Sequence, residues 1–260
     1  MKKMEFHLPF DQKSFTLYGS ESDQSVLYYM ELENGYYEAY VMNLLRRVVA
    51  PDAVCLDIGA NLGTISLAFS HLAKKGKVYA FEPSNVNYGY LVQTIADNSI
   101  RNIEPLKLGV FDRNGTISFR EVAHGGGWSF IDTKQTDSTD SSSQITCVRL
   151  DDWVITSALE RIDIIKVDVE GSEMEVLQGG AETFRRFDPD LVIEFNLDSM
   201  VNNFGKNPLD LFTLLQSMYA NMYLIRRDDQ VVKVTDYDSL LEMIKPFHGD
   251  LYCTNKKAWG

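Results

Sequence analysis

Acidic residues stand at the ends of several short apolar stretches in this sequence. The acids in such positions are Asp57, Glu82, Asp168 and Glu170. Carboxylates attract cations, accept hydrogen bonds from hydroxyl groups and take up protons from reacting groups. The carboxyl ends of parallel strands form one edge of a sheet, and ligands lie at that edge. We therefore expect these side chains to share a site.

The segment Asp57-Ile58-Gly59-Ala60-Asn61-Leu62-Gly63 has the pattern of a ligand-binding loop. Its glycines let backbone approach a ligand, and the helix that follows offers free N–H groups. A dinucleotide loop reads G-x-G-x-x-G, which is a different spacing, and Asp57 would face a phosphate there. A cofactor that has no phosphate but carries an ammonium and a sulfonium fits better, and S-adenosylmethionine is such a cofactor. Glu82, about 20 residues further on, can accept both ribose hydroxyls of either cofactor.

Alternating strand and helix patterns must position these residues. Apolar runs predict strands, and apolar residues at helical spacing predict helices. We expect strands at 54–57, 77–81, 103–110, 162–169 and 191–195, and helices at 63–74, 85–98, 172–177 and 209–219. Because these strands are apolar throughout, they predict a mostly parallel α/β sheet with helices on both faces.

The remaining segments complete one structural domain. Residues 1–50 predict an N-terminal cap, either a small hairpin or irregular, followed by a helix, and residues 51–260 predict the sheet domain. An insertion at 111–150 lies between the third and fourth main strands, and its Asn114-Gly115 pair predicts a hairpin. Further strand patterns near the C-terminus predict an antiparallel edge of the sheet.

Composition narrows the function. The chain has 260 residues and a formal net charge of -12, which argues against nucleic acid as a partner. Cys55, Cys147 and Cys253 lie far apart and form no C-x-x-C pair, so neither a zinc site nor a disulfide framework is expected. The N-terminal residues lack the apolar core of a signal peptide, and no apolar run reaches the roughly 20 residues that span a bilayer. We therefore predict a cytoplasmic protein without a membrane span.

Five motifs in this order resemble the FkbM family of S-adenosylmethionine-dependent methyltransferases. They are DIGANLG at 57–63, AFEP at 80–83, the pair Leu150-Asp151, IKVDVEGSE at 165–173 and PDLVIEF at 189–195. The resemblance covers roughly residues 38–196. It implies a class I Rossmann-like methyltransferase fold with a seven-stranded, mostly parallel sheet. It also implies O-methylation of a hydroxyl on a sugar, glycan or polyketide-type small molecule.

The resemblance also implies which residues contact the cofactor. The methionine end would be lined by Asp57, Gly59, Asn61 and Gly63, the ribose would be bound by Glu82, and the adenine would lie by Gly109 and Val110. Asn61 stands where many methyltransferases have glycine, but asparagine also tolerates positive φ, so the turn is expected to persist.

Methyl transfer to a hydroxyl needs a base beside the cofactor. Asp168 is the first candidate because it ends a strand next to the loop. Glu170 is the second, and His124 in the Gly-rich insertion is the third. We predict no metal. The alternative is a divalent cation held by Asp168, Glu194 and Asn196, which end adjacent strands and offer hard oxygen ligands.

Two other functions remain open from the sequence. One is an NAD-type oxidoreductase, against which the loop spacing argues, and the other is a non-catalytic S-adenosylmethionine-binding scaffold. The expected partner is a small-molecule or glycan acceptor, and the chain is expected to be a monomer or homodimer.

Overall fold

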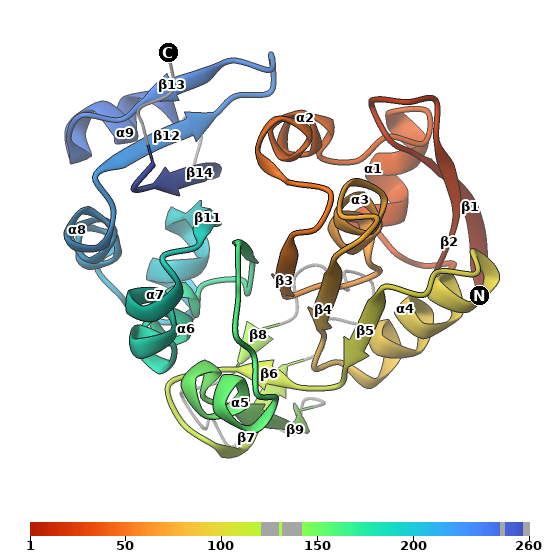
Figure 1. Cartoon of the computed structure of the whole chain (residues 1–260), viewed down its shortest axis with the longest axis horizontal. Coiled ribbons are helices and arrows are strands. Elements are labelled where there is room, and N and C mark those ends of the chain that lie inside the picture. Colours follow the sequence, from red (N-terminus) through yellow and green to blue (C-terminus); the bar gives the residue numbers. More distant parts are fainter. Residues whose placement is uncertain (121–129, 132–141, 245–247, 257–260) are drawn as a thin grey trace.

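The computed structural model describes residues 1–120, 130–131, 142–244 and 248–256. Its largest sheet has eight strands (Figure 1). In spatial order they are β13 (Val231–Lys233), β12 (Asn221–Ile225), β14 (His248–Thr254), β11 (Asp190–Asn196), β10 (Ile164–Val167), β3 (Val54–Ile58), β4 (Lys77–Phe81) and β5 (Ile103–Leu106).

The strands from β11 to β5 run parallel, whereas β14, β12 and β13 form an antiparallel edge. The predicted fold class and the antiparallel edge are therefore confirmed. The sheet has one strand more than expected because the short β13 extends that edge. The switch in strand order lies between β10 and β3, and open α/β sheets bind their ligands at such a point.

Two apolar cores lie on opposite faces of the sheet, because successive strand residues point to opposite sides. On β3, for example, Cys55 belongs to one core and Leu56 to the other. The first core is covered by α1 (Val26–Leu32), α2 (Ala39–Val48), α3 (Thr64–Leu72) and α4 (Asn85–Asp97). The second is covered by α5 (Leu150–Thr156), α6 (Glu173–Gly179), α7 (Ala181–Phe187), α8 (Pro208–Met218) and α9 (Tyr237–Met243), with the π-helix η2 (Ser199–Asn203) nearby.

Of the two alternatives for the N-terminal segment, the structure has the hairpin, formed from β1 (Lys2–His7) and β2 (Ser14–Gly19). The backbone N–H of Thr16 donates to Asn98 Oδ1 at 2.9 Å, and that of Tyr18 donates to Thr94 Oγ1 at 3.1 Å. These bonds attach the hairpin to α4 (Figure 1). In the ranges that are described, no helix combines the length and the apolarity needed to cross a bilayer.

The insertion forms a second sheet, and two predictions made for this region are wrong. The sheet has the order β6 (Gly109–Val110), β9 (Ser142–Val148), β7 (Gly115–Arg120) and β8 (Phe130–Ile131). The expected strand at 103–110 is two strands, because the chain leaves the main sheet after Leu106.

The Asn114-Gly115 pair does not close a hairpin, since β9 lies between β6 and β7. Asn114 instead ties the turn to the end of β9. Its Oδ1 accepts from the Arg149 N–H at 2.8 Å, and its Nδ2 donates to Asp152 Oδ2 at 2.6 Å.

Candidate functional site

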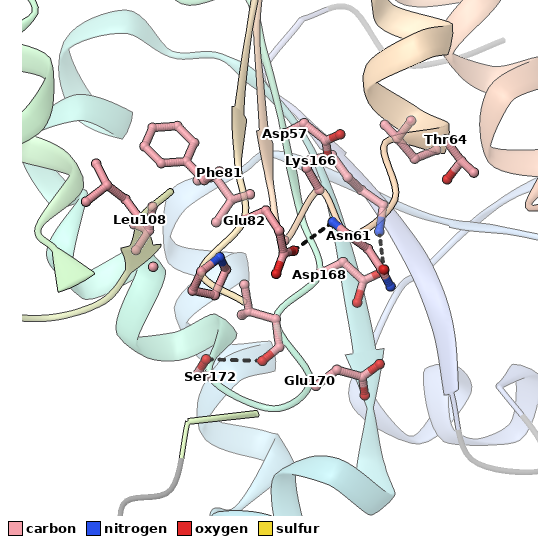
Figure 2. Close-up of a pocket in the computed structure, with 18 of the residues that line it drawn as sticks. Asp57, Asn61, Thr64, Phe81, Glu82, Leu108, Lys166, Asp168, Glu170 and Ser172 are labelled. Carbon is pink, nitrogen blue, oxygen red and sulfur yellow. Dashed lines mark hydrogen bonds and ion pairs between the residues drawn. The ribbon is translucent and has the colours of Figure 1, made fainter. Parts of the chain in front are cut away.

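A pocket lies at the carboxyl ends of β3, β4 and β10 (Figure 2). It is lined by most of the residues that the sequence singled out, which come from four separate segments of the chain. These residues are Asp57, Gly59, Asn61, Glu82, Gly109, Val110, Asp168 and Glu170. The sheet therefore brings the candidate cofactor residues and two candidate bases to one place.

Three predicted site residues lie elsewhere, and one cannot be placed. Gly63 is the N-cap of α3 and is not on the pocket lining. Glu194 and Asn196 are near the end of β11, beside the pocket rather than on its lining. His124 lies outside the described residues, so its proposed role stays a prediction.

The loop after β3 packs directly against the end of β10. Gly59 has φ +88°, and a Cβ there would lie 1.7 Å from the carbonyl oxygen of Asp168. Only glycine fits this contact, because both the dihedral angle and the space exclude a side chain. Asn61 also has positive φ, at +51°, so the left-handed turn expected of asparagine is present.

Glu82 holds this loop in place. Its side chain is buried, its Oε2 accepts from the Asn61 N–H at 2.8 Å, and its Oε1 accepts from the Ser84 N–H at 2.8 Å. A carboxylate oxygen has two lone pairs, so one that accepts a backbone N–H can in general also accept a hydroxyl hydrogen. The sequence indicated that Glu82 could bind the ribose of a cofactor. The structure adds the hydrogen bond from the Asn61 N–H to Glu82, which holds the loop after β3 (Figure 2).

Asp57 is buried beneath the same loop. It is 2% exposed, and the hydroxyl of Ser66 donates to its Oδ2. Burial raises the pKa of Asp57 to about 6, although the bond from Ser66 and the charge of Lys166 partly oppose this. Because a group with a pKa of about 6 is mostly ionised at pH 7, Asp57 adds negative charge at the methionine end of the candidate cofactor site.

Lys166 is a pocket residue to which the sequence analysis gave no role. It is 1% exposed, and its Nζ lies 3.0 Å from Asp168 Oδ2 and 3.3 Å from Asp250 Oδ1. Burial alone would lower the pKa of Lys166, but the surrounding carboxylates raise it well above its usual range. The side chain is therefore an ammonium that fixes Asp168 (Figure 2). Residues two apart in a strand point to the same face, so the sequence could have shown that Lys166 lies beside Asp168.

Three carboxylates meet where β10 and β11 end. Asp168, Glu170 and Glu194 each offer an oxygen, and these atoms lie within 4.8 Å of one another. Burial and the neighbouring carboxylates raise the pKa values of Glu170 and Glu194 well above the usual range. Among the described residues this trio has the geometry to hold a cation. It contains Glu170, whereas the sequence alternative named Asn196, whose Nδ2 instead donates to Glu194 Oε1 at 3.4 Å.

The N-terminal segment also reaches the pocket. Tyr37 and Glu38, just before α2, line it together with Val26 at the start of α1. The sequence gave no pocket role to these residues, because their distance from the strand motifs along the chain hides their proximity in space.

Comparison with known proteins gives three findings. The family model of the methyltransferase FkbM domain matches residues 57–220. The chain is 31% identical over 170 residues to the 2-O-methyltransferase NoeI of Sinorhizobium fredii. It is 32% identical over 144 residues to the hexuronic acid methyltransferase AglP of Haloferax volcanii. These matches cover 56% and 55% of this chain, and 63% and 56% of the relatives, so the chain spans less than two thirds of each relative's length.

A solved structure shares the fold. The methyltransferase FkbM from Methylobacillus flagellatus KT superposes with a TM-score of 0.51 at 17% sequence identity. The superposition covers 78% of this chain and 44% of that chain.

Proposed function

The chain belongs to the methyltransferase FkbM family, and from this premise we propose that it transfers a methyl group from S-adenosylmethionine to a hydroxyl of a sugar, glycan or polyketide-type small molecule. Membership makes it a methyltransferase, so the oxidoreductase alternative is set aside. The donor, the acceptor and the residues that act on them are parts of the proposal.

The charge of the pocket lining is the observation that carries the choice of donor. The lining contains five acids, of which Glu38 and Glu170 have raised pKa values, and one basic residue, Lys166, which is already paired with two carboxylates. Such a lining repels phosphate and attracts a sulfonium and an ammonium. Its other end is apolar, with Leu108, Val110 and Phe119, and suits an adenine ring. S-adenosylmethionine has both kinds of group.

Asp168 is the proposed base. It ends β10 beside the cofactor loop, and Lys166 holds one of its oxygens. The acceptor oxygen attacks the methyl carbon opposite the sulfur, and the C–S bond breaks as the O–C bond forms. The hydroxyl proton passes to the carboxylate, and S-adenosylhomocysteine is left. Glu170 is the second candidate, and Lys166 disfavours a divalent cation at Asp168 because both would compete for the same carboxylate.

The two curated relatives are named for 2-O-methyl transfer and for hexuronic acid methylation, which supports a sugar hydroxyl as acceptor. The three carboxylates of Asp168, Glu170 and Glu194 limit which sugars this chain is expected to accept. The burial and negative charge that raise the pKa values of Glu170 and Glu194 would also disfavour an acceptor with its own carboxylate next to the reacting hydroxyl. We therefore expect a neutral or amino-substituted sugar to be methylated faster than the matching uronic acid.

Calorimetric titration with S-adenosylmethionine and S-adenosylhomocysteine tests the donor. We expect both ligands to bind the wild type, Glu82→Ala to weaken both, and the exposed Glu104→Ala, as the matched control, to leave binding unchanged. Absence of binding to the wild type would overturn the proposal. Binding without methyl transfer to any acceptor in a sugar screen would favour the scaffold alternative.

A further inference from the structure

We propose that Glu38, from the N-terminal segment, binds the ammonium group of the cofactor's methionine moiety. This inference rests on the proposed S-adenosylmethionine dependence and adds a residue from outside the matched range of 57–220. The N-terminal segment would then complete the cofactor site, in addition to covering the sheet.

The backbone of Glu38 points to a role other than helix formation. Glu38 is the N-cap of α2, with φ 47° and ψ 39°, and its side chain makes no capping hydrogen bond. Residues other than glycine seldom adopt this left-handed conformation, and glutamate is not a preferred N-cap. Residues held in such conformations cluster at ligand sites. Glu38 lines the pocket, as do Asn61 and Glu170, which also have positive φ.

Among the residues that the structure describes, the carboxylate of Glu38 has no hydrogen-bond or ion-pair partner, unlike those of the other acids on the lining. Asp57 accepts a hydrogen bond from Ser66, and Glu82 accepts from Asn61 and Ser84. Asp168 accepts from Lys166, and Glu170 accepts from Ser199. Within the described part of the chain, the side chain of Glu38 forms no hydrogen bond or ion pair. A carboxylate in a pocket gains most from a cationic donor, because such hydrogen bonds are the strong ones.

Burial raises the pKa of Glu38 to about 8, so the free site favours the protonated acid near pH 7, and a bound ammonium would favour its carboxylate. The charge of Lys166 opposes the rise in this pKa, and Asp250, Asp168 and Asp57 add to it. These neighbours also locate Glu38. It lies at the charged end of the pocket, near Asp57 and Lys166, and the apolar residues proposed to hold the adenine are at the other end.

A second unpaired acceptor lies on the same lining. Asn61 Oδ1 is buried, and no described residue donates a hydrogen bond to it. An ammonium has three N–H donors and no acceptor, so a carboxylate and an amide oxygen suit it. Glu38 and Asn61 come from different parts of the chain and line the same pocket, and an ammonium in contact with either one would satisfy that acceptor. No apolar or anionic ligand group would do so.

Paired ligands make the test specific. S-adenosylhomocysteine carries the ammonium, whereas 5′-methylthioadenosine has the same adenosine and thioether but lacks the amino-acid group. Calorimetry would measure both on the wild type, on Glu38→Gln and on the exposed control Glu33→Gln from the same segment. We expect Glu38→Gln to weaken S-adenosylhomocysteine about 10- to 100-fold and to leave 5′-methylthioadenosine within about 2-fold. Glu33→Gln should change neither.

Other outcomes overturn the inference in distinguishable ways. Equal losses for both ligands would mean that Glu38 only shapes the pocket. Unchanged binding with a lower kcat would place Glu38 on the acceptor or the base. If Glu38→Gln does not fold, Glu38→Asp replaces it, since it keeps the charge and should weaken S-adenosylhomocysteine selectively through its shorter reach. Failure of the wild type to bind either ligand would instead remove the proposed function together with this inference.

Discussion

Replacing Lys166 with methionine should lower the free energy of unfolding by about 3–5 kcal/mol. The lysine is 1% exposed and contacts two carboxylates, of which Asp250 is also buried, with a 5% exposed side chain. At an effective dielectric constant of about 20, each contact contributes roughly 5 kcal/mol of attraction, and the desolvation of the ammonium offsets part of the sum. Methionine has a similar length, so the change removes the charge and leaves little cavity.

Denaturant unfolding followed by circular dichroism measures this loss, and the melting temperature should fall by about 2–4 °C for each kcal/mol. Lys77→Met is the matched control. Lys77 pairs with Glu104 at 2.9 Å, but the two side chains are 37% and 47% exposed, so we expect a loss of at most about 1 kcal/mol.

A double variant tests the cause. Adding Asp250→Asn to Lys166→Met removes one of the two orphaned charges, and an asparagine oxygen can still accept the bond that Tyr40 donates to Asp250 at 2.9 Å. We expect about 1–2 kcal/mol to be recovered. The reasoning is refuted if Lys166→Met lies within about 1 kcal/mol of the wild type, or if the double variant is less stable than the single one.

Three further predictions concern the loop, its acid and the carboxylate trio. Gly59→Ala should destabilise the protein by about 2–4 kcal/mol, because its Cβ would meet the carbonyl oxygen of Asp168. The control Gly89→Ala lies in an exposed part of α4 with nothing near its Cβ, and it should stabilise the protein by about 0.5–1 kcal/mol. Thermal melts measure both changes. Burial raises the pKa of Asp57 from 3.8 to about 6, so protonation favours the folded state, and this stabilisation is complete below about pH 4 and lost as the pH rises through 6. Between pH 4 and 7 the wild type should therefore lose about 2–3 kcal/mol relative to Asp57→Asn in urea titrations, and a slope of opposite sign would contradict the assignment. Turnover should not change after dialysis against EDTA, because the Lys166 ammonium already occupies one side of Asp168, and recovery of lost activity by added Mg²⁺ would instead support a metal at the trio.

The sequence by itself determined the α/β fold and the strand ends that form the pocket. Apolar runs of strand length and helical spacings are local patterns, and the structure confirms the strand at 77–81. For the N-terminal segment the sequence left a hairpin and an irregular cap open, and the structure has the hairpin. The loop at 57–63 was also recognisable locally, because glycine and asparagine at fixed positions signal a turn with positive φ. Once strands end at one edge of a parallel sheet, their terminal residues must be neighbours, so most of the candidate cofactor residues lie on one lining.

Tertiary structure alone decided what each of these residues contacts. Lys166 pairs with Asp250 because β14 lies next to β11 in the sheet. The local sequence of neither strand predicts that order. Glu38 reaches the pocket because the N-terminal segment packs on the face occupied by α3 and α4. The Asn114 turn failed to form a hairpin because β9 pairs with both of its neighbours. Such contacts join distant segments, and the burial of apolar surface over the whole chain selects them.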